Sequence, residues 1–262
     1  RERMKSLMTS IALLSLAATA AAQDQQLGAR TKAMGGSYTA FEDDPVSIWL
    51  NPAGIATQPD QLSIAYQTYT AYPKGRERGP GDTVDFTVEA STVMGDPGLL
   101  PSYIGFVFQV GDAASPVAIG ICYAQPYLLD YAMDQVKDPN QPSFVPEAEV
   151  QQVFGRFRIS IAKDFRISDV GTPGFFSHVS AGAGLDCGYT RWHFSGLGED
   201  TTVSNVGVGG GFGALLGLYD NYSSFKVNLG VAYTTKVSYD FHIDPNILPA
   251  FVMPQQLNVG VT

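Results

Sequence analysis

Candidate catalytic residues are sparse in this sequence, and their spacing matches no catalytic geometry. A hydrolase needs a nucleophile, a base and an orienting group, and a metal site needs several ligands at close spacing. The three histidines, His178, His193 and His242, are scattered along the chain. Asp186 and His193 differ by seven positions, which places them on opposite faces of one strand. We therefore expect no enzymatic activity, no cofactor and no metal.

The glycine-rich run from Gly207 to Gly213 is the second candidate for chemistry, as a phosphate-binding loop. Phe212 stands where the GxGxxG pattern needs its last glycine. The glycines at every second position instead fit the inner side of a thin wall against which another segment packs.

Isolated charges on the inner faces of predicted strands are the third candidate. Arg156 and Arg158 alternate with the apolar Phe157, Ile159 and Ile161, so both should point inward. They could meet the carboxylate headgroup of a ligand, or they could pair with acids of the same protein, because buried charges need partners. Other polar side chains on predicted inner faces are candidate ligand contacts as well: Asp186, Lys226 and Asn228.

Composition limits the class of protein that carries these residues. The chain has 262 residues, only 16% of them charged, and a formal net charge of -9. The acidic balance argues against a nucleic-acid surface, which needs clustered Lys and Arg. No apolar run of about 20 residues follows residue 22, so a bundle of membrane helices is excluded.

Residues 1–22 have the pattern of a secretory signal peptide. Lys5 lies in a charged start, an apolar stretch runs from Leu7 to Ala18, and Ala20–Ala22 precede polar residues. The alternative, a membrane anchor, would need a longer stretch.

From about residue 61 the chain alternates apolar with small or polar residues, which is the periodicity of β-strands. The clearest segment runs from Phe225 to Asp240, with Tyr239 on its apolar face. We count about eight such strands, and residues 82–92 form a possible further one. A soluble sheet also alternates, but its strands average about 5–6 residues, and these are longer. The pattern predicts an all-β fold, a transmembrane antiparallel β-barrel, over residues 61–262.

The predicted faces and connections carry further expectations. Cys122 should point inward and Cys187 outward, so we expect no disulfide between them. Tyr and Trp near predicted strand ends, including Tyr239, fit an interfacial girdle. The connections at 73–101 and 127–146 are long and should be exposed loops.

Residues 23–60 do not alternate and should form a small helical hatch. Asp43 or Asp44 before Pro45 is a plausible helix N-cap, and Asn51 with Pro52 marks a turn. This stretch resembles the N-terminal hatch of the FadL/TodX family of outer-membrane transporters for hydrophobic compounds. The matching residues are Gly28, Ala33, Gly35, Gly36, Ala40, Asp43, Asp44, Ser47, Asn51, Pro52, Ala53 and Gly54.

The resemblance implies a barrel of 14 strands with the hatch inside, of which about eight strands are present here, so the chain is expected to be C-terminally truncated. It also implies lateral release of substrate near the third strand. Pro126 falls at the end of that strand, where a missing backbone donor could create a defect in the wall. Alternatively, Pro126 only ends the strand.

Three functions remain open from the sequence. The first is passive transport of long-chain fatty acids or other hydrophobic small molecules across the bacterial outer membrane, with membrane lipids as surroundings. The second is an outer-membrane component that binds secreted or periplasmic proteins, since the hatch also resembles the related outer-membrane protein of the type IX secretion system. The third is a soluble exported β protein.

Overall fold

A computed structural model describes most of the chain beyond the predicted signal peptide. The described residues are Leu27, Thr31, 38–41, 43–66, 70–71, 74–78, 83–91, 101–112, 115–133, 148–167, 174–196, 199–220, 226–239, 251–253 and 255–262. Predicted positions Gly28, Ala33, Gly35, Gly36 and His242 lie outside these ranges.

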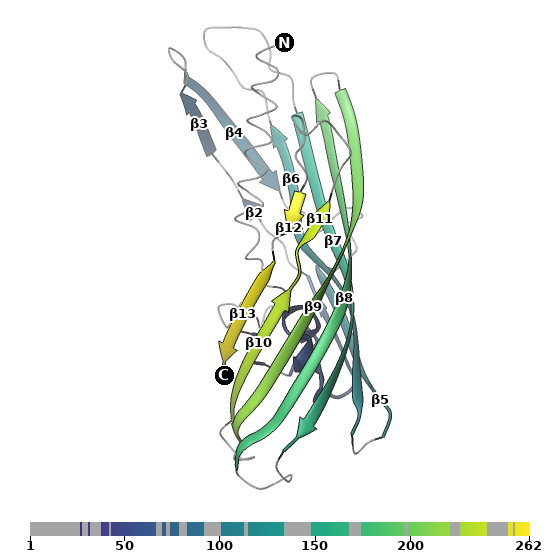
Figure 1. Ribbon diagram of the computed structural model, residues 1–262. Coiled ribbons are helices and arrows are strands. Elements are labelled where there is room, and N and C mark those ends of the chain that lie inside the picture. The colour runs from purple at the N-terminus through teal and green to yellow at the C-terminus, as the bar shows by residue number, and fades with distance from the viewer. Residues whose placement is uncertain are drawn as a thin grey trace.

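Eight strands form one continuous antiparallel path in the order β1-β5-β6-β7-β8-β9-β10-β13. In Figure 1 the longest of them run side by side as an oblique, curved wall. The all-β prediction and the count of eight strands are thus confirmed. The bounds are β1 Gln61–Ala65, β5 Tyr103–Val110, β6 Val117–Met133, β7 Ala148–Arg166, β8 Gly174–Gly196, β9 Glu199–Asp220, β10 Lys226–Thr234 and β13 Gln256–Val261.

Shorter strands extend this sheet above its main path. β4 (Thr83–Ser91) pairs with β2 (Thr70–Ala71), with β3 (Lys74–Arg78) and with the end of β6. Part of the connection at 73–101, predicted as a loop, forms the hairpin β3–β4, and β4 confirms the possible further strand at residues 82–92. Residues 127–133, predicted as part of a second loop, belong to β6. The second correction reflects a strand, β6, that continues past the apolar alternation on which the prediction depended. In the described ranges β1 and β13 are each paired on one side only, so the sheet is an open wall there.

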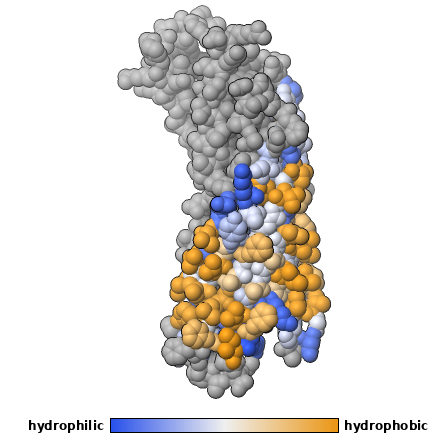
Figure 2. Space-filling model, in the orientation of Figure 1, coloured by the Kyte–Doolittle hydropathy of each residue, from blue (hydrophilic) through white to orange (hydrophobic). Residues whose placement is uncertain are grey.

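The two faces of the wall differ as the alternation predicted. On β7, Phe157, Ile159 and Ile161 are exposed, whereas Arg156 and Arg158 are buried on the concave side. Figure 2 shows the hydrophobic residues gathered over the lower part of the molecule, with hydrophilic residues mainly at their margins. The exposed apolar set includes Leu62, Ile64, Ile104, Phe106, Phe157, Ile159, Ile161, Leu185, Tyr189, Val206, Val208, Phe212, Val231, Tyr233, Leu257, Val259 and Val261.

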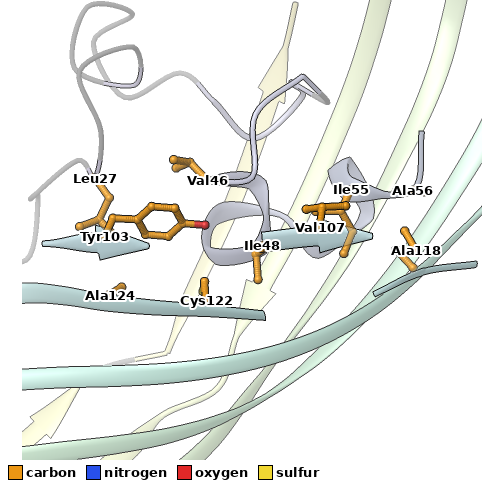
Figure 3. Packing of buried hydrophobic residues seen from close by; sticks show 11 residues of the cluster. Leu27, Val46, Ile48, Ile55, Ala56, Tyr103, Val107, Ala118, Cys122 and Ala124 are labelled. Atoms are coloured by element: carbon orange, nitrogen blue, oxygen red, sulfur yellow. The ribbon is translucent and has the colours of Figure 1, made fainter. Parts of the chain in front are cut away.

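The described part of the hatch, chiefly residues 43–60, lies against the concave side of this wall (Figure 1). It contains a one-turn helix α3 (Ser47–Leu50) and a 3-10 turn η1 (Pro52–Ile55). Its apolar residues Val46, Ile48 and Ile55 pack with Tyr103 of β5 and Cys122 of β6, as Figure 3 shows. Because neither element is long enough to be stable alone, this packing against the wall positions the hatch.

One predicted strand departs from its expected course. The strand predicted over Phe225–Asp240 ends at Thr234, and a separate β11 (Val237–Tyr239) pairs with β12 (Phe251–Met253). Tyr239 is consequently buried, 1% exposed, rather than part of an outer girdle. The chain leaves the strand at residues 235–236. The side chains of Val237 and Tyr239, predicted on the outer face, therefore lie on the inner side.

Pro126 does not end its strand, because β6 continues to Met133. The pairing of β6 with β7 shifts register between Ala124 and Tyr127. A proline at a bulge is expected, since it has no N–H for the ladder.

Candidate functional site: a buried Arg–Asp–Arg cluster against the hatch

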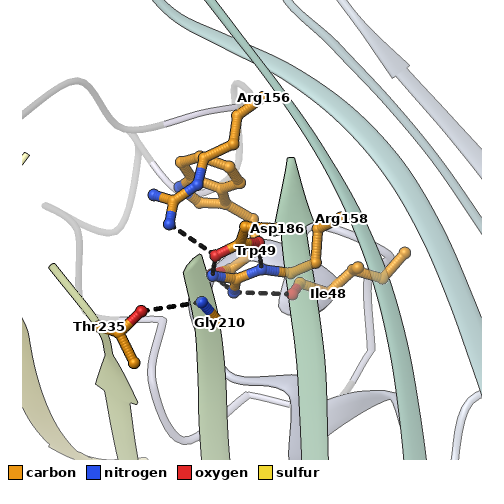
Figure 4. Close-up of polar contacts among 7 residues, drawn as sticks. All are labelled: Ile48, Trp49, Arg156, Arg158, Asp186, Gly210 and Thr235. Carbon is orange, nitrogen blue, oxygen red and sulfur yellow. Dashed lines mark hydrogen bonds and ion pairs between the residues drawn. The ribbon is translucent and has the colours of Figure 1, made fainter. Parts of the chain in front are cut away.

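Two arginines and one aspartate meet inside the wall, beside the hatch (Figure 4). Arg156 Nη2 lies 2.6 Å from Asp186 Oδ2, and Arg158 Nε lies 2.5 Å from Asp186 Oδ1. Arg158 Nη2 donates a further hydrogen bond of 2.8 Å to Asp186 Oδ2. Arg158 thus binds the carboxylate in a bidentate manner, the stronger geometry for this pair. Of the two roles left open for these arginines, the structure shows the pairing with an acid of the protein.

Strand register brings these residues together. Arg158 of β7 is directly opposite Asp186 of β8, and Arg156 is opposite Gly188. Both arginines reach across to β9, where glycines leave room for their guanidinium groups. A Cβ built on Gly211 would lie 3.0 Å from Arg158 Nη2, and one built on Gly209 would lie 3.3 Å from Arg156 Nη2. The period-2 glycines therefore do form a thin inner wall, as predicted.

The hatch supplies the other side of the cluster. Arg158 Nη1 donates to the backbone oxygens of Ile48, at 3.2 Å, and Trp49, at 2.7 Å. The ring of Trp49 lies 5.1 Å from Arg156 Cζ and 5.3 Å from Arg158 Cζ, which is cation–π distance. Arg158 thus joins β7, β8 and the C-terminal end of α3 in one contact.

The cluster carries more positive than negative charge. Arg156 and Arg158 are 4% and 1% exposed, and they share the single carboxylate of Asp186. Arg158 uses its Nε, Nη1 and Nη2 atoms in hydrogen bonds, whereas Arg156 Nε is buried without a hydrogen-bond partner. An unpaired buried donor on a charged group is costly. An anionic ligand group would therefore gain the most binding free energy from contact with Arg156.

Asn51 holds the hatch to the wall below this cluster. Its Oδ1 accepts from Ala53 N at 3.1 Å, and its Nδ2 donates to Thr39 O at 2.6 Å and to Ala214 O of β9 at 3.3 Å. Three wall glycines face hatch backbone or Asn51 so closely that any side chain would collide with it: Gly182, Gly213 and Gly230.

The other predicted hatch residues have local structural partners. Asp44 Oδ1 accepts from Val46 N at 2.9 Å, just before α3, although the cap residue of the helix is Val46. Asp43 Oδ1 accepts from Tyr38 Oη at 2.7 Å. Pro52, Ala53 and Gly54 are buried in η1, with Asn51 as its cap.

The remaining predicted ligand contacts lie apart from the cluster. Asn228 is buried on β10, and its Nδ2 lies 3.5 Å from Ala40 O of the hatch. Lys226 is exposed at the start of β10. The pairing of β10 with β9 shifts register between Val227 and Asn228, which interrupts the alternation just after Lys226.

Sequence reasoning missed two aromatic residues at the site. Trp49 was not singled out, although it is the one tryptophan in a segment rich in small residues. Tyr239 was assigned to the outer face, and no sequence signal marks the bend that turns it inward.

The predicted faces of other reactive residues are confirmed. Cys122 is buried and Cys187 exposed, both as free thiols. Asp186 and His193 do not meet, since His193 Nδ1 is hydrogen-bonded to Thr202 Oγ1 at 2.8 Å.

In the described part of the chain no cluster of His, Cys, Asp or Glu side chains could hold a metal ion. Across the same ranges, no helix has both the length and the apolar character to cross a bilayer.

The fold and the site define a class of architecture, an antiparallel β wall with a small helical segment packed on its concave side. Comparison of the chain with protein-family models, with curated proteins and with solved structures found no match. The resemblance to the FadL/TodX family therefore stays a prediction from the sequence.

Proposed function

We propose that this protein carries hydrophobic small molecules with an anionic end group, such as long-chain fatty acids, across the bacterial outer membrane by passive transport. In this account the wall is part of a transmembrane β-barrel and the hatch closes its interior. The ligand's carboxylate binds Arg156, and its apolar chain lies against the small inner residues of the wall.

One observation carries the proposal: apolar side chains are exposed on successive strands while buried positive charge lies inside. Soluble monomers rarely expose contiguous apolar patches larger than a few hundred Å², and here seven of the eight main strands contribute exposed apolar residues. Small and polar residues on the opposite face are typical of a membrane barrel. The acidic net charge and the arginine cluster together favour a localised site for one anionic group.

Substitution of Arg156 by glutamine tests the headgroup contact. Arg156→Gln removes the positive charge with the surplus donor, so uptake of a labelled fatty acid at limiting concentration should fall by roughly 10- to 100-fold, the range for a charge-assisted hydrogen bond of about 1.5–3 kcal/mol. Uptake of the corresponding fatty alcohol, which has no carboxylate, should change little.

Arg166→Gln is the matched control. It makes the same change on the same strand, but the Arg166 side chain is 62% exposed, and uptake should equal that of the parent. Equal fatty-acid uptake in cells with and without the parent protein would refute transport of this substrate.

A protein-binding role is the second candidate, supported by the hairpin β3–β4. This hairpin stands above the main wall in Figure 1, and β3 has the charged sequence Lys-Gly-Arg-Glu-Arg. Capture of secreted proteins by the parent, lost on deletion of residues 74–91 without a defect in uptake, would favour this role.

A further inference from the structure

Thr190 of β8 carries a buried hydroxyl that the arginine cluster does not use. Its side chain is 0% exposed and lies on the same face of the strand as Asp186. Its Oγ1 atom has no hydrogen-bond partner among the described residues. A hydroxyl that has lost its bonds to water lowers stability unless a partner replaces them. Such a group needs an explanation, and a bond that forms only with a ligand is one.

Strand register makes Thr190 a neighbour of Arg156. Arg156 is opposite Gly188 of β8, and Thr190 is the next residue of β8 on the same face. The Cα atoms of such diagonal neighbours lie about 7–8 Å apart, within reach of a long side chain such as arginine. Arg156 contributes a second buried atom without a partner in the described part of the chain, its Nε. A charged donor and a hydroxyl, both unpaired, are thus neighbours on the inner wall.

The position of Tyr239 indicates what kind of group the space between these two residues accepts. A Cβ built on Gly188 would collide with Tyr239 Oη, so the phenol hydroxyl lies directly over this glycine. The ring of Tyr239 lies 6.1 Å from the ring of Phe154, and Phe154 is opposite Thr190. The place over Gly188, beside Arg156 and Thr190, therefore holds a hydroxyl group of the protein itself.

Ser160 of β7 offers a comparison on the other side of the cluster. Its side chain is 1% exposed, and across the described ranges its Oγ also lacks a hydrogen-bond partner. Its neighbour along the strand face is Arg158, whose Nε, Nη1 and Nη2 atoms all donate hydrogen bonds already. Of these two hydroxyls, Thr190 is therefore the one that adjoins an unpaired charged donor.

We propose that the ligand carries a hydroxyl group close to its carboxylate, and that Thr190 binds this hydroxyl while Arg156 binds the carboxylate. The substrate class is then fatty acids with a hydroxyl on the second or third carbon, near enough to the carboxylate for one ligand to reach both residues. The inference rests on the proposed transport function. Because a hydroxyl both donates and accepts, the threonine and the ligand can bond in either direction, and Tyr239 Oη yields its place over Gly188 to the ligand.

Uptake of two labelled acids of equal chain length tests this substrate class. Thr190 gains a partner from the hydroxylated acid and stays unpaired with the unsubstituted one. At limiting concentration, the parent protein should take up the acid with a hydroxyl on its third carbon at least about tenfold faster, a difference of about 1.4 kcal/mol. An acid with its hydroxyl at the far end of the chain should show no such advantage.

Three variants assign the preference to Thr190 through the ratio of the two uptake rates. Comparison of this ratio between variants cancels any difference in how the acids partition into the membrane. Thr190→Val keeps the branched shape without the hydroxyl, so the advantage should disappear, whereas Thr190→Ser keeps the hydroxyl and should keep the advantage. Ser160→Ala is the matched control, because it removes the other unpaired hydroxyl, and it should leave the ratio at the parent value.

Ligand binding by the purified full protein in detergent provides a measurement that does not depend on uptake. The ring of Trp49 lies 5.1 Å from Arg156 Cζ, so tryptophan emission should respond to occupancy of the site. The parent should bind the hydroxylated acid at least about tenfold more tightly than the unsubstituted acid, which is about 1.4 kcal/mol, and Thr190→Val should lose this preference.

The outcomes separate this inference from the proposed function. Equal affinity of the parent for both acids, or a preference that survives Thr190→Val, would overturn recognition of the hydroxyl and leave transport standing. Absence of uptake of both acids by the parent would overturn transport and the substrate class together.

Discussion

Asp186 is the residue on which the buried cluster depends. It is the single acid that pairs with both arginines, and all three side chains are nearly inaccessible to solvent. A buried charge left without its partner is strongly destabilising, whereas an exposed ion pair contributes little. Asp186 should therefore contribute far more to the free energy of unfolding than a surface acid on the same hairpin.

Substitution by the amide tests this difference. Asp186→Asn keeps the shape of the side chain but leaves two buried guanidinium groups unneutralised, and we expect a loss of about 3–5 kcal/mol in the free energy of unfolding. Asp200→Asn, whose parent side chain is 75% exposed, should change it little. Urea titration of both variants in detergent micelles measures the effect, and similar midpoints would show that Asp186 does not neutralise the cluster.

The hatch and the inner glycines are the features that matter at the scale of the elements. α3 and η1 are one turn each and gain their position from Asn51, from Arg158 and from the glycines opposite them. Gly213 on β9 leaves the space that Asn51 and the backbone of Ala53 occupy. A side chain at position 213 would collide with Asn51 and with the backbone of Ala53, so the hatch could not keep its present position.

Gly213→Val should therefore displace the hatch. We expect faster amide hydrogen exchange in residues 43–58. We also expect a loss of about 1–3 kcal/mol in the free energy of unfolding, which is typical of overpacking. Ala214→Val is the control, because Ala214 is the next residue on β9 and its side chain is exposed on the outer face. Unchanged exchange in the Gly213 variant would mean that the hatch is not seated against this glycine.

Alternation along a strand explains how much of this site was predictable. The face of Arg156, Arg158 and Asp186 follows directly from a period of two, and so does the burial of Cys122. Their pairing depends on the register between β7 and β8, which no local pattern encodes. The apolar alternation runs unbroken through residues 235–236, so it could not reveal the bend that buries Tyr239.

At the scale of the whole molecule, a wall with an apolar outside and a polar inside explains both the near-zero mean hydropathy and the low charge content. Along the described strands the apolar outer set alternates with the small or polar inner set, and the buried charges of Arg156, Arg158 and Asp186 lie on the inner face. The central claim is that the outer set, exposed in the structure, faces lipid.

Spin labels on β7 test that claim most directly. Single cysteines replacing Phe157, Ile159 and Ile161, in a background with Cys122→Ala and Cys187→Ser, place labels on the exposed face of the wall. In reconstituted bilayers of the full protein we predict frequent collisions with oxygen, which partitions into lipid, and few with a water-soluble nickel chelate. Frequent collisions with the chelate at all three positions would show that this face meets water and would contradict the membrane barrel.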